Sequence, residues 1–194
     1  ETALNVPADQ IGAKYKEIIA SKFTPRALFY FIGKGFREEE IAMGVACLAM
    51  IPARAGGVVY TVDPLAPHSQ DLIIHASWGL GMAVVDGTVS PDIFIINKED
   101  PSGIKSQQIA HKERMQVCTP QGGIESRDVP PDQRDQPSLT TEQIRKLVSL
   151  ARIVEEHYQR PQDIEWAVDP RGEIFLLQTR PLKVFAPPVC RETP

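Results

Sequence analysis

The feature that most limits how this 194-residue chain can fold is a series of apolar runs that are only five to seven residues long. These runs are rich in Val, Ile, Phe and Tyr and are separated by Gly, Pro and Asp, a pattern typical of β-strands joined by turns. We expect strands over residues 27–32, 45–51, 57–62, 72–76 and 93–97. Short strands in series, with helices set apart from them, predict an α+β fold with a mostly antiparallel sheet packed with helices.

Two longer segments repeat apolar residues at helical spacing. The first covers residues 8–22, and the second begins after Thr140, which forms a capping-box pattern with Gln143 and continues to about Tyr158. A short helix is expected over residues 80–85. Residues 118–137 are rich in Pro, Gln, Asp and Arg, which indicates an exposed loop.

Charge and cysteine content exclude several classes of protein. The net charge is −4 and no Lys/Arg cluster stands out, which argues against nucleic-acid binding and against a polybasic membrane contact. No apolar run approaches the roughly 20 residues that span a bilayer. Cys47, Cys118 and Cys190 fit no zinc or disulfide pattern, so we expect a cytoplasmic protein. The start at Glu1, without an initiator Met or a signal peptide, suggests a segment of something longer.

A predicted hairpin near the C-terminus carries the strongest candidate site. Its strands cover residues 163–168 and 173–179 around a four-residue turn, which would pair Glu165 with Leu176. Side chains alternate between the two faces of a sheet. A turn one residue longer or shorter would therefore reverse which residues share a face.

In the four-residue register, Glu165, Gln178 and Arg180 share one face of the hairpin, with Glu165 and Gln178 as diagonal neighbours. The other face is apolar. It would carry Ile164, Trp166, Val168, Phe175 and Leu177. Carboxylate and amide oxygens are ligands that Mg²⁺ accepts, and an Arg guanidinium suits phosphate. The set fits ATP·Mg, but a solvated sheet face would look the same in the sequence.

Five blocks of sequence resemble one family of enzymes. D-I-E-W-A at 163–167 and L-L-Q-T-R-P at 176–181 are similar to the signature D-I-E-W … L-Q-x-R-P, which ends the ATP-grasp domain of phosphoenolpyruvate synthases, pyruvate phosphate dikinases and rifampin phosphotransferases. G-V-V-Y-T-V-D-P at 57–64, A-S-W-G-L-G at 76–81 and E-T-A-L-N-V at 1–6 also match this family. The resemblance implies an ATP-grasp-like subdomain, the C-terminal part of a nucleotide-binding domain, over residues 1–186, and a linker or tail over 187–194.

The resemblance also implies roles for individual residues. Glu165 and Gln178 would bind Mg²⁺, and Arg180 would be the catalytic residue that holds the terminal phosphates of ATP. The family enzyme phosphorylates a histidine on a swivelling domain, which then carries the phosphoryl group to a pyruvate-binding domain where phosphoenolpyruvate forms. The expected partners are therefore ATP, the front half of the ATP-grasp domain and those two domains.

The stretch from Leu48 through Met50 to Ile51 matches the hinge whose backbone meets the adenine edge in this family. Leu48 and Ala49 replace the usual Gln and Lys/Arg, and Met82 stands where the family usually has Glu. These departures keep a second interpretation open, a degenerate ATP-grasp module that binds a nucleotide or a partner without catalysis.

The histidines do not match the phosphorylated histidine of the family, because none has the glycine neighbours of that motif. They are His68, His75, His111 and His157. We therefore expect no phosphohistidine in this chain and no phosphotransfer by the chain alone. Another dikinase acceptor, such as rifampin or a glucan, is compatible with the same ATP-binding motifs.

Overall fold

The computed structural model describes residues 2–37, 41–66, 68–100 and 103–184. The chain divides into two compact units. The first unit comprises Glu1–Met50 and Cys118–Glu125, and the second comprises Ile51–Val117 and Ser126–Pro194. The expected tail at 187–194 and Cys190 lie outside the described residues. Within the described part of the chain, no helix has the length and apolar character that crossing a bilayer requires.

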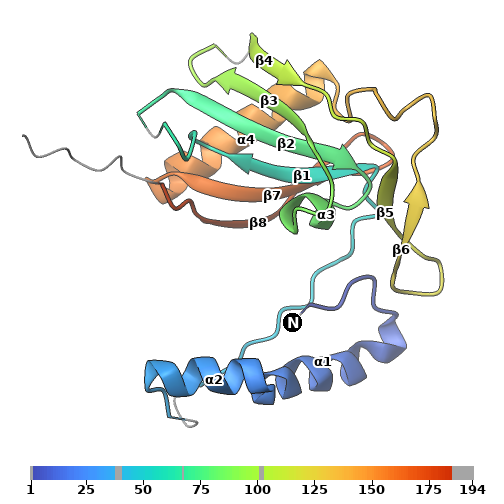
Figure 1. Ribbon diagram of the computed structural model, residues 1–194, viewed down its shortest axis with the longest axis vertical. Coiled ribbons are helices and arrows are strands. Elements are labelled where there is room, and N and C mark those ends of the chain that lie inside the picture. Colours follow the sequence, from blue (N-terminus) through green and yellow to red (C-terminus); the bar gives the residue numbers. More distant parts are fainter. Residues whose placement is uncertain (1, 38–40, 67, 101–102, 185–194) are drawn as a thin grey trace, which may run out of the picture. The chain divides into compact units, whose positions relative to one another are not determined.

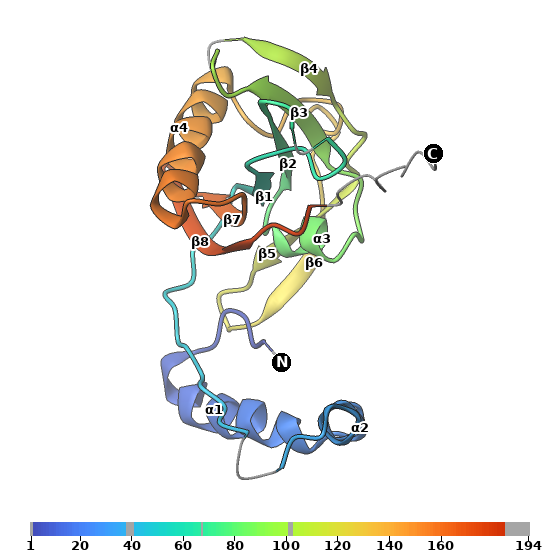
Figure 2. The same ribbon diagram turned by 90° about the vertical axis from the view of Figure 1, so that its left-hand side faces the viewer.

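The second unit is built on a six-stranded antiparallel sheet (Figure 1) with the strand order β4-β3-β2-β1-β7-β8. Its strands are β1 (Ala55–Tyr60), β2 (Asp71–Trp78), β3 (Asp92–Asn97), β4 (Ile104–Gln108), β7 (Gln162–Val168) and β8 (Ile174–Pro181). Helix α4 (Thr141–Tyr158) covers one face, and the short helix α3 (Met82–Val85) lies on the other side of the sheet (Figure 2). The predicted α+β fold is confirmed.

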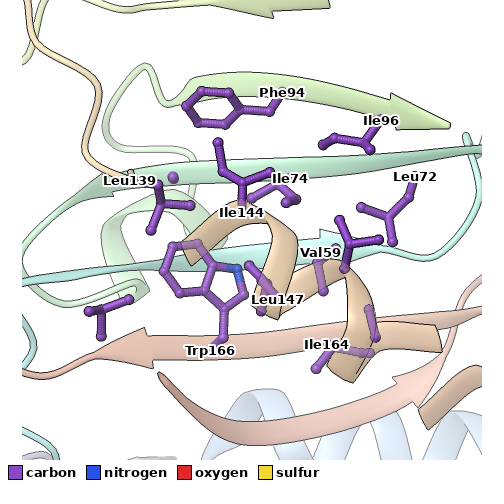
Figure 3. Close-up of a cluster of buried hydrophobic side chains, with 14 of the residues drawn as sticks. Val59, Leu72, Ile74, Phe94, Ile96, Leu139, Ile144, Leu147, Ile164 and Trp166 are labelled. Carbon is purple, nitrogen blue, oxygen red and sulfur yellow. The ribbon is translucent and has the colours of Figure 1, made fainter. Parts of the chain in front are cut away.

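The hydrophobic core lies between α4 and the sheet (Figure 3). Trp166 and Ile164 point from β7 toward Ile144 and Leu147 of α4, and all four side chains are buried. Removing a buried side chain as large as Trp166 typically costs about 3–5 kcal/mol. This packing fixes which face of β7 is turned to the core, so the alternate residues of β7 are turned to the opposite face of the sheet.

Helix α4 begins as the sequence predicts. The Thr140 hydroxyl accepts a hydrogen bond from the Gln143 amide at 3.2 Å, and the Gln143 side-chain oxygen accepts one from the Thr140 amide at 3.0 Å. This capping box satisfies two amides that would otherwise lack helical partners. The helix ends at Tyr158, and the next residue, Gln159, caps it with a positive φ of 53° in the left-handed region.

A buried ion pair links β3 to the segments that precede β5 and α4. The Lys112 ammonium donates to Asp92, and both side chains are almost completely buried. The backbone amides of Ala110 and Ser138 also donate to Asp92, at 3.0 Å and 2.8 Å, and the Ser138 hydroxyl donates at 2.7 Å. A carboxylate so fully bonded can remain charged in the interior.

The first unit contains the helices α1 (Ile11–Ala20) and α2 (Pro25–Lys34), with 3-10 turns at Ala8–Gln10 and Ser21–Phe23. Strands β5 (Arg114–Cys118) and β6 (Ile124–Asp128) form a separate two-stranded sheet, and the connection between them belongs to this unit. The Asn5 side chain donates to the carbonyl oxygens of Thr119 and Gly123, both at 2.8 Å, and so joins the N-terminal segment to that connection.

Three expectations about secondary structure are wrong. The expected strand over 27–32 is part of α2, because Thr24 caps the helix and Pro25 occupies its first turn, where a missing N–H costs nothing. Residues 45–51 form no strand. The expected loop over 118–137 contains β6, whose residues pair with β5 across a short connection.

Candidate functional site

The β7–β8 hairpin brings Glu165 and Gln178 directly opposite each other. Val168 pairs with Ile174, so the turn has the five residues 169–173, one more than expected from the sequence. A β-bulge follows, because the pairing shifts between Trp166 and Glu165 and leaves Leu177 as an extra residue of β8. The two residues are therefore direct partners rather than diagonal ones, and they share a face of the sheet.

The longer turn changes which apolar residues face the core. Leu176 is the cross-strand partner of Trp166, whereas Phe175 pairs with Ala167 on the other face and Leu177 lies in the bulge. The expectation that Phe175 and Leu177 share the core face with Trp166 is thus wrong. The physical reason is that one additional turn residue moves every pair by one position.

Arg180 is held by Asp163, a residue that was not expected at the site from the sequence. Asp163 and Arg180 are cross-strand partners, and the Arg180 Nε donates to Asp163 Oδ2 at 2.8 Å. The Asp163 side chain is only 8% exposed, and that of Arg180 is 58% exposed. Asp163 Oδ1 is buried without a hydrogen-bond partner among the described residues. The sequence feature that points to Asp163 is its position two residues before Glu165, which places both side chains on the same face of a strand.

The neighbouring strands complete this face. Val58 and Tyr60 of β1 pair with Glu165 and Asp163, and His75 of β2 pairs with Val58. The rings of Tyr60 and His75 meet edge to face, with centroids 5.5 Å apart. An aromatic and imidazole surface thus lies beside the carboxylates on the side of the sheet opposite α4.

The electrostatics of the face depend on partial burial. Burial raises the pKa of Glu165 above its ordinary value of 4.5; Arg180 opposes this shift, and Asp163 and Asp86 reinforce it. Burial also lowers the pKa of His75 below 6.5. The carboxylates are therefore close enough to destabilise one another's charge, and a bound cation would relieve that repulsion.

Glycines permit the loop before α3 to lie against β1. A Cβ atom on Gly56 would lie 2.6 Å from the backbone nitrogen of Gly81, and one on Gly81 would lie 2.6 Å from that of Gly57. Gly79 adopts a φ of +76°, which other residues rarely adopt. Backbone packing thus accounts for Gly79 and Gly81 without a bound phosphate.

The residues expected at the adenine hinge lie away from regular structure. Leu48 and Met50 belong to the first unit and Ile51 to the second, and none lies in a helix or strand. The Leu48 side chain is 75% exposed. Met82 is the first residue of α3. The structure therefore brings Glu165, Gln178 and Arg180 together in one hairpin of the second unit, whereas Leu48 and Met50 belong to the first unit.

The donor set of the hairpin fits a hard cation that keeps ligands from elsewhere. Glu165 offers a carboxylate, Gln178 an amide oxygen, and Asp163 a buried oxygen without a partner. Across the described part of the chain, no group of three or more His, Cys, Asp or Glu side chains could hold a metal ion. Mg²⁺ typically has one or two protein carboxylates and takes its other ligands from water and phosphate, so the residues fit Mg²⁺ better than a metal that needs a complete protein cage.

Comparisons with known proteins show the family to which this chain is similar. The family model described as pyruvate phosphate dikinase, AMP/ATP-binding domain, matches residues 1–189. A probable phosphoenolpyruvate synthase of Methanocaldococcus jannaschii is 36% identical over 183 residues, covering 94% of this chain and 15% of the relative. The phosphoenolpyruvate synthase of Escherichia coli is 35% identical over 193 residues, covering 93% and 24%. The rifampicin phosphotransferase of Bacillus subtilis is 34% identical over 188 residues, covering 96% and 21%. The chain spans less than a quarter of the length of each of these relatives.

Proposed function

Because the chain belongs to the family of pyruvate phosphate dikinase AMP/ATP-binding domains, we propose that it is the ATP·Mg-binding part of a dikinase. This dikinase phosphorylates a histidine of a separate swivelling domain on the way from pyruvate to phosphoenolpyruvate. The observation that carries the proposal is the direct pairing of Glu165 with Gln178 beside Arg180. Residues 1–186 form the rear part of an ATP-grasp domain, and residues 187–194 a linker or tail.

Glu165 and Gln178 would hold Mg²⁺ through one carboxylate oxygen and one amide oxygen. When bound with ATP, the ion supplies positive charge that offsets the charge of the phosphate oxygens. Without a cation, Glu165 and Asp163 repel a triphosphate. The residues of this hairpin therefore make nucleotide binding depend on the metal.

Arg180 positions the terminal phosphates in this proposal. Its Nε is already bonded to Asp163, which leaves the donors of its two terminal nitrogens for phosphate oxygens. A guanidinium fixed at one nitrogen loses less side-chain freedom when it binds a phosphate. Positioning and charge stabilisation supply most of the catalysis in phosphoryl transfer, and Arg180 is suited to both.

The adenine would be bound by the backbone of Leu48, Met50 and Ile51. The side chains of Leu48 and Ala49, which replace the usual Gln and Lys/Arg, cannot make the polar contacts of those residues. The final phosphoryl acceptor is a separate matter. The B. subtilis relative is named a rifampicin phosphotransferase and is about as similar to this chain as the named phosphoenolpyruvate synthases are. This supports an ATP-binding region shared across acceptors.

Met82, in the place of the usual Glu, favours a module that binds nucleotide without catalysis as the second candidate.

Calorimetry of the 194-residue chain with ATP, in the presence and absence of Mg²⁺, tests the proposal. We expect weak binding, with a Kd in the high micromolar to millimolar range; a Kd of 1 mM corresponds to about −4 kcal/mol. The reason is that Arg180 is the cation that we identify for the phosphates, and it lies beside carboxylates that repel them. The binding should require Mg²⁺. Equal binding with and without the metal would overturn the proposed site. Labelled phosphoenolpyruvate formed from pyruvate and ATP by this chain alone would overturn the assignment of catalysis to further domains.

A further inference from the structure

Strand β8, which carries Gln178 and Arg180, is an edge strand of the six-stranded sheet (Figure 1). Among the described strands, β8 is bonded only to β7. Backbone hydrogen bonds can form in more than one register, so the side chains of the strand have to select one. Burial selects only weakly here, because Phe175, Leu176 and Leu177 remain 37%, 37% and 42% exposed.

Thr179 makes a contact that depends on the register. It lies between Gln178 and Arg180 and pairs with Ile164, so its side chain is on the core side of β8. Its hydroxyl donates to Gln162 Oε1 at 2.8 Å. A shift of β8 by one residue would break this bond and would turn Gln178 and Arg180 to the core side. The other core-side residues of β8 have no polar side-chain atom to offer; they are Ile174, Leu176 and Pro181.

Gln162 is a fixed acceptor for the Thr179 hydroxyl. It is only 1% exposed, and its Nε2 donates to the carbonyl oxygens of Arg160 and Pro161, both at 3.1 Å. These two bonds leave the Oε1, which can only accept, turned to Thr179. Without the Thr179 hydroxyl, a buried acceptor would lose this partner, and burying an unsatisfied acceptor is costly.

Further hydrogen bonds connect Gln162 to the rest of the second unit. Its backbone amide donates to Thr61 Oγ1 at 2.8 Å, and the buried Thr61 hydroxyl donates to Glu155 Oε1 of α4 at 2.9 Å. The Lys98 ammonium donates to both oxygens of Glu155, at 2.9 Å and 2.7 Å. The position of Gln162 is therefore fixed by α4 and by the residues that follow β1 and β3.

The bond between Arg180 and Asp163 is a weaker anchor for β8 than the Thr179 bond. The Arg180 side chain is 58% exposed, so water competes for its donors. The same guanidinium also binds phosphate in the proposed function. The Thr179 bond lies on the opposite face of the sheet and needs no ligand.

We propose that Thr179 is a positioning residue for the nucleotide site. Bonded to Gln162, it holds the part of β8 beyond the bulge in the register that keeps Gln178 and Arg180 on the face of Glu165. The consequence for ATP·Mg binding rests on the proposed function, whereas the register can be measured without nucleotide.

The first test measures the register in two variants without nucleotide. T179V removes the hydroxyl and keeps the branched shape, whereas T179S keeps the hydroxyl. In T179V, hydrogen exchange of the β8 amides beyond Leu177 should speed up roughly tenfold, because a hydrogen bond to a buried acceptor contributes about that factor to an equilibrium constant. The nuclear Overhauser contact between Glu165 and Gln178 should weaken, and T179S should resemble the wild type. Unchanged exchange in T179V, or equal effects of T179V and T179S, would overturn the proposal.

Two further variants separate positioning from a general loss of stability. Ile144 lies in the core on α4, so I144V should lower the thermal midpoint without changing exchange in β8. Q162M removes the acceptor of the Thr179 hydroxyl, so adding T179V to it should change exchange little further. Faster β8 exchange in I144V, or additive effects of Q162M and T179V, would overturn the proposal.

The last test adds nucleotide. T179V should raise the Kd for ATP with Mg²⁺ about threefold or more, since a fall of the aligned fraction to about a third raises the apparent Kd by that factor. T179S and I144V should bind as the wild type does. Wild-type affinity in a T179V variant with faster exchange would overturn the positioning role. A wild-type chain that binds no ATP would instead overturn the proposed function, and the exchange measurements would still decide whether Thr179 sets the register.

Discussion

Glu165 and Gln178 lie directly opposite each other on β7 and β8 because two irregularities of the hairpin compensate. The turn after Val168 has one residue more than a four-residue turn. A regular ladder continued from that turn would pair Glu165 with Leu177 and place Gln178 on the core side of the sheet. The bulge at Leu177 adds one residue to β8, so Gln178 returns to the face of Glu165.

Two single-residue deletions in β8 test this register. Deleting Leu177 should be tolerated, because it turns the bulge into a regular ladder and leaves Gln178 opposite Glu165. Deleting Thr179 should turn Arg180 to the core side, break its bond to Asp163 and lower the thermal midpoint. Nucleotide titration of both variants, with circular dichroism as a check on folding, distinguishes them. Equal loss of Mg²⁺-dependent ATP binding in the two would contradict the account.

Replacing Glu165 by Gln keeps the shape of the side chain and removes its charge. We expect the Kd for ATP with Mg²⁺ to rise roughly tenfold or more, about 1.4 kcal/mol, because a charged metal ligand is lost. Gln178→Ala should act in the same direction but more mildly, since an amide oxygen is the weaker ligand. Glu173→Gln, in the same hairpin but bonded to the exposed Lys146, serves as the control and should bind as the wild type does.

The raised pKa of Glu165 predicts how binding depends on pH. Because only the ionised carboxylate binds Mg²⁺ well, ATP binding should weaken as the pH falls through a value above 4.5, the ordinary pKa of a Glu side chain. Calorimetry over a pH series, with Glu165→Gln as the comparison, measures this loss. Binding that stays constant down to the ordinary Glu pKa would contradict it.

The same shift has a consequence for stability. A folded-state pKa above the unfolded value means that the ionised carboxylate destabilises the folded protein, fully so at neutral pH, and that protonation removes this cost as the pH falls. Glu165→Gln should therefore melt at a higher temperature than the wild type at pH 7, and the difference should disappear in acid. A variant that is less stable at pH 7 would show that Glu165 has a structural role instead.

Sequence patterns predicted those parts of the fold whose periodicity is clear. The Thr140 capping box located the start of α4, and alternation located β7 and the face of Glu165. Residues 27–32 were assigned wrongly because an unbroken apolar run has the period of neither a strand nor a helix, and the deciding signals, Thr24 and Pro25, precede it. The bulge at Leu177 could not be predicted, because it depends on how the hairpin packs against β1 and α4.

The buried Asp92–Lys112 pair should dominate the stability of the second unit. Asp92→Asn leaves the Lys112 ammonium buried without a counter-charge, and such a change typically costs about 3–5 kcal/mol. Asp71→Asn is the control, since it removes the partner of the exposed Lys105, and such pairs contribute about 1 kcal/mol or less. Urea denaturation of both variants measures the difference. Equal destabilisation would contradict this assignment.

The most direct test of the central claim is a nuclear magnetic resonance titration of the isotopically labelled chain with ATP. With Mg²⁺ present, the account predicts that the backbone amides of Glu165, Gln178 and Arg180 and their neighbours on β7 and β8 shift as nucleotide is added. These shifts should vanish when Mg²⁺ is withheld and in Glu165→Gln. Shifts that avoid β7 and β8, or that persist unchanged without the metal and in the variant, would contradict the claim that this hairpin holds ATP·Mg.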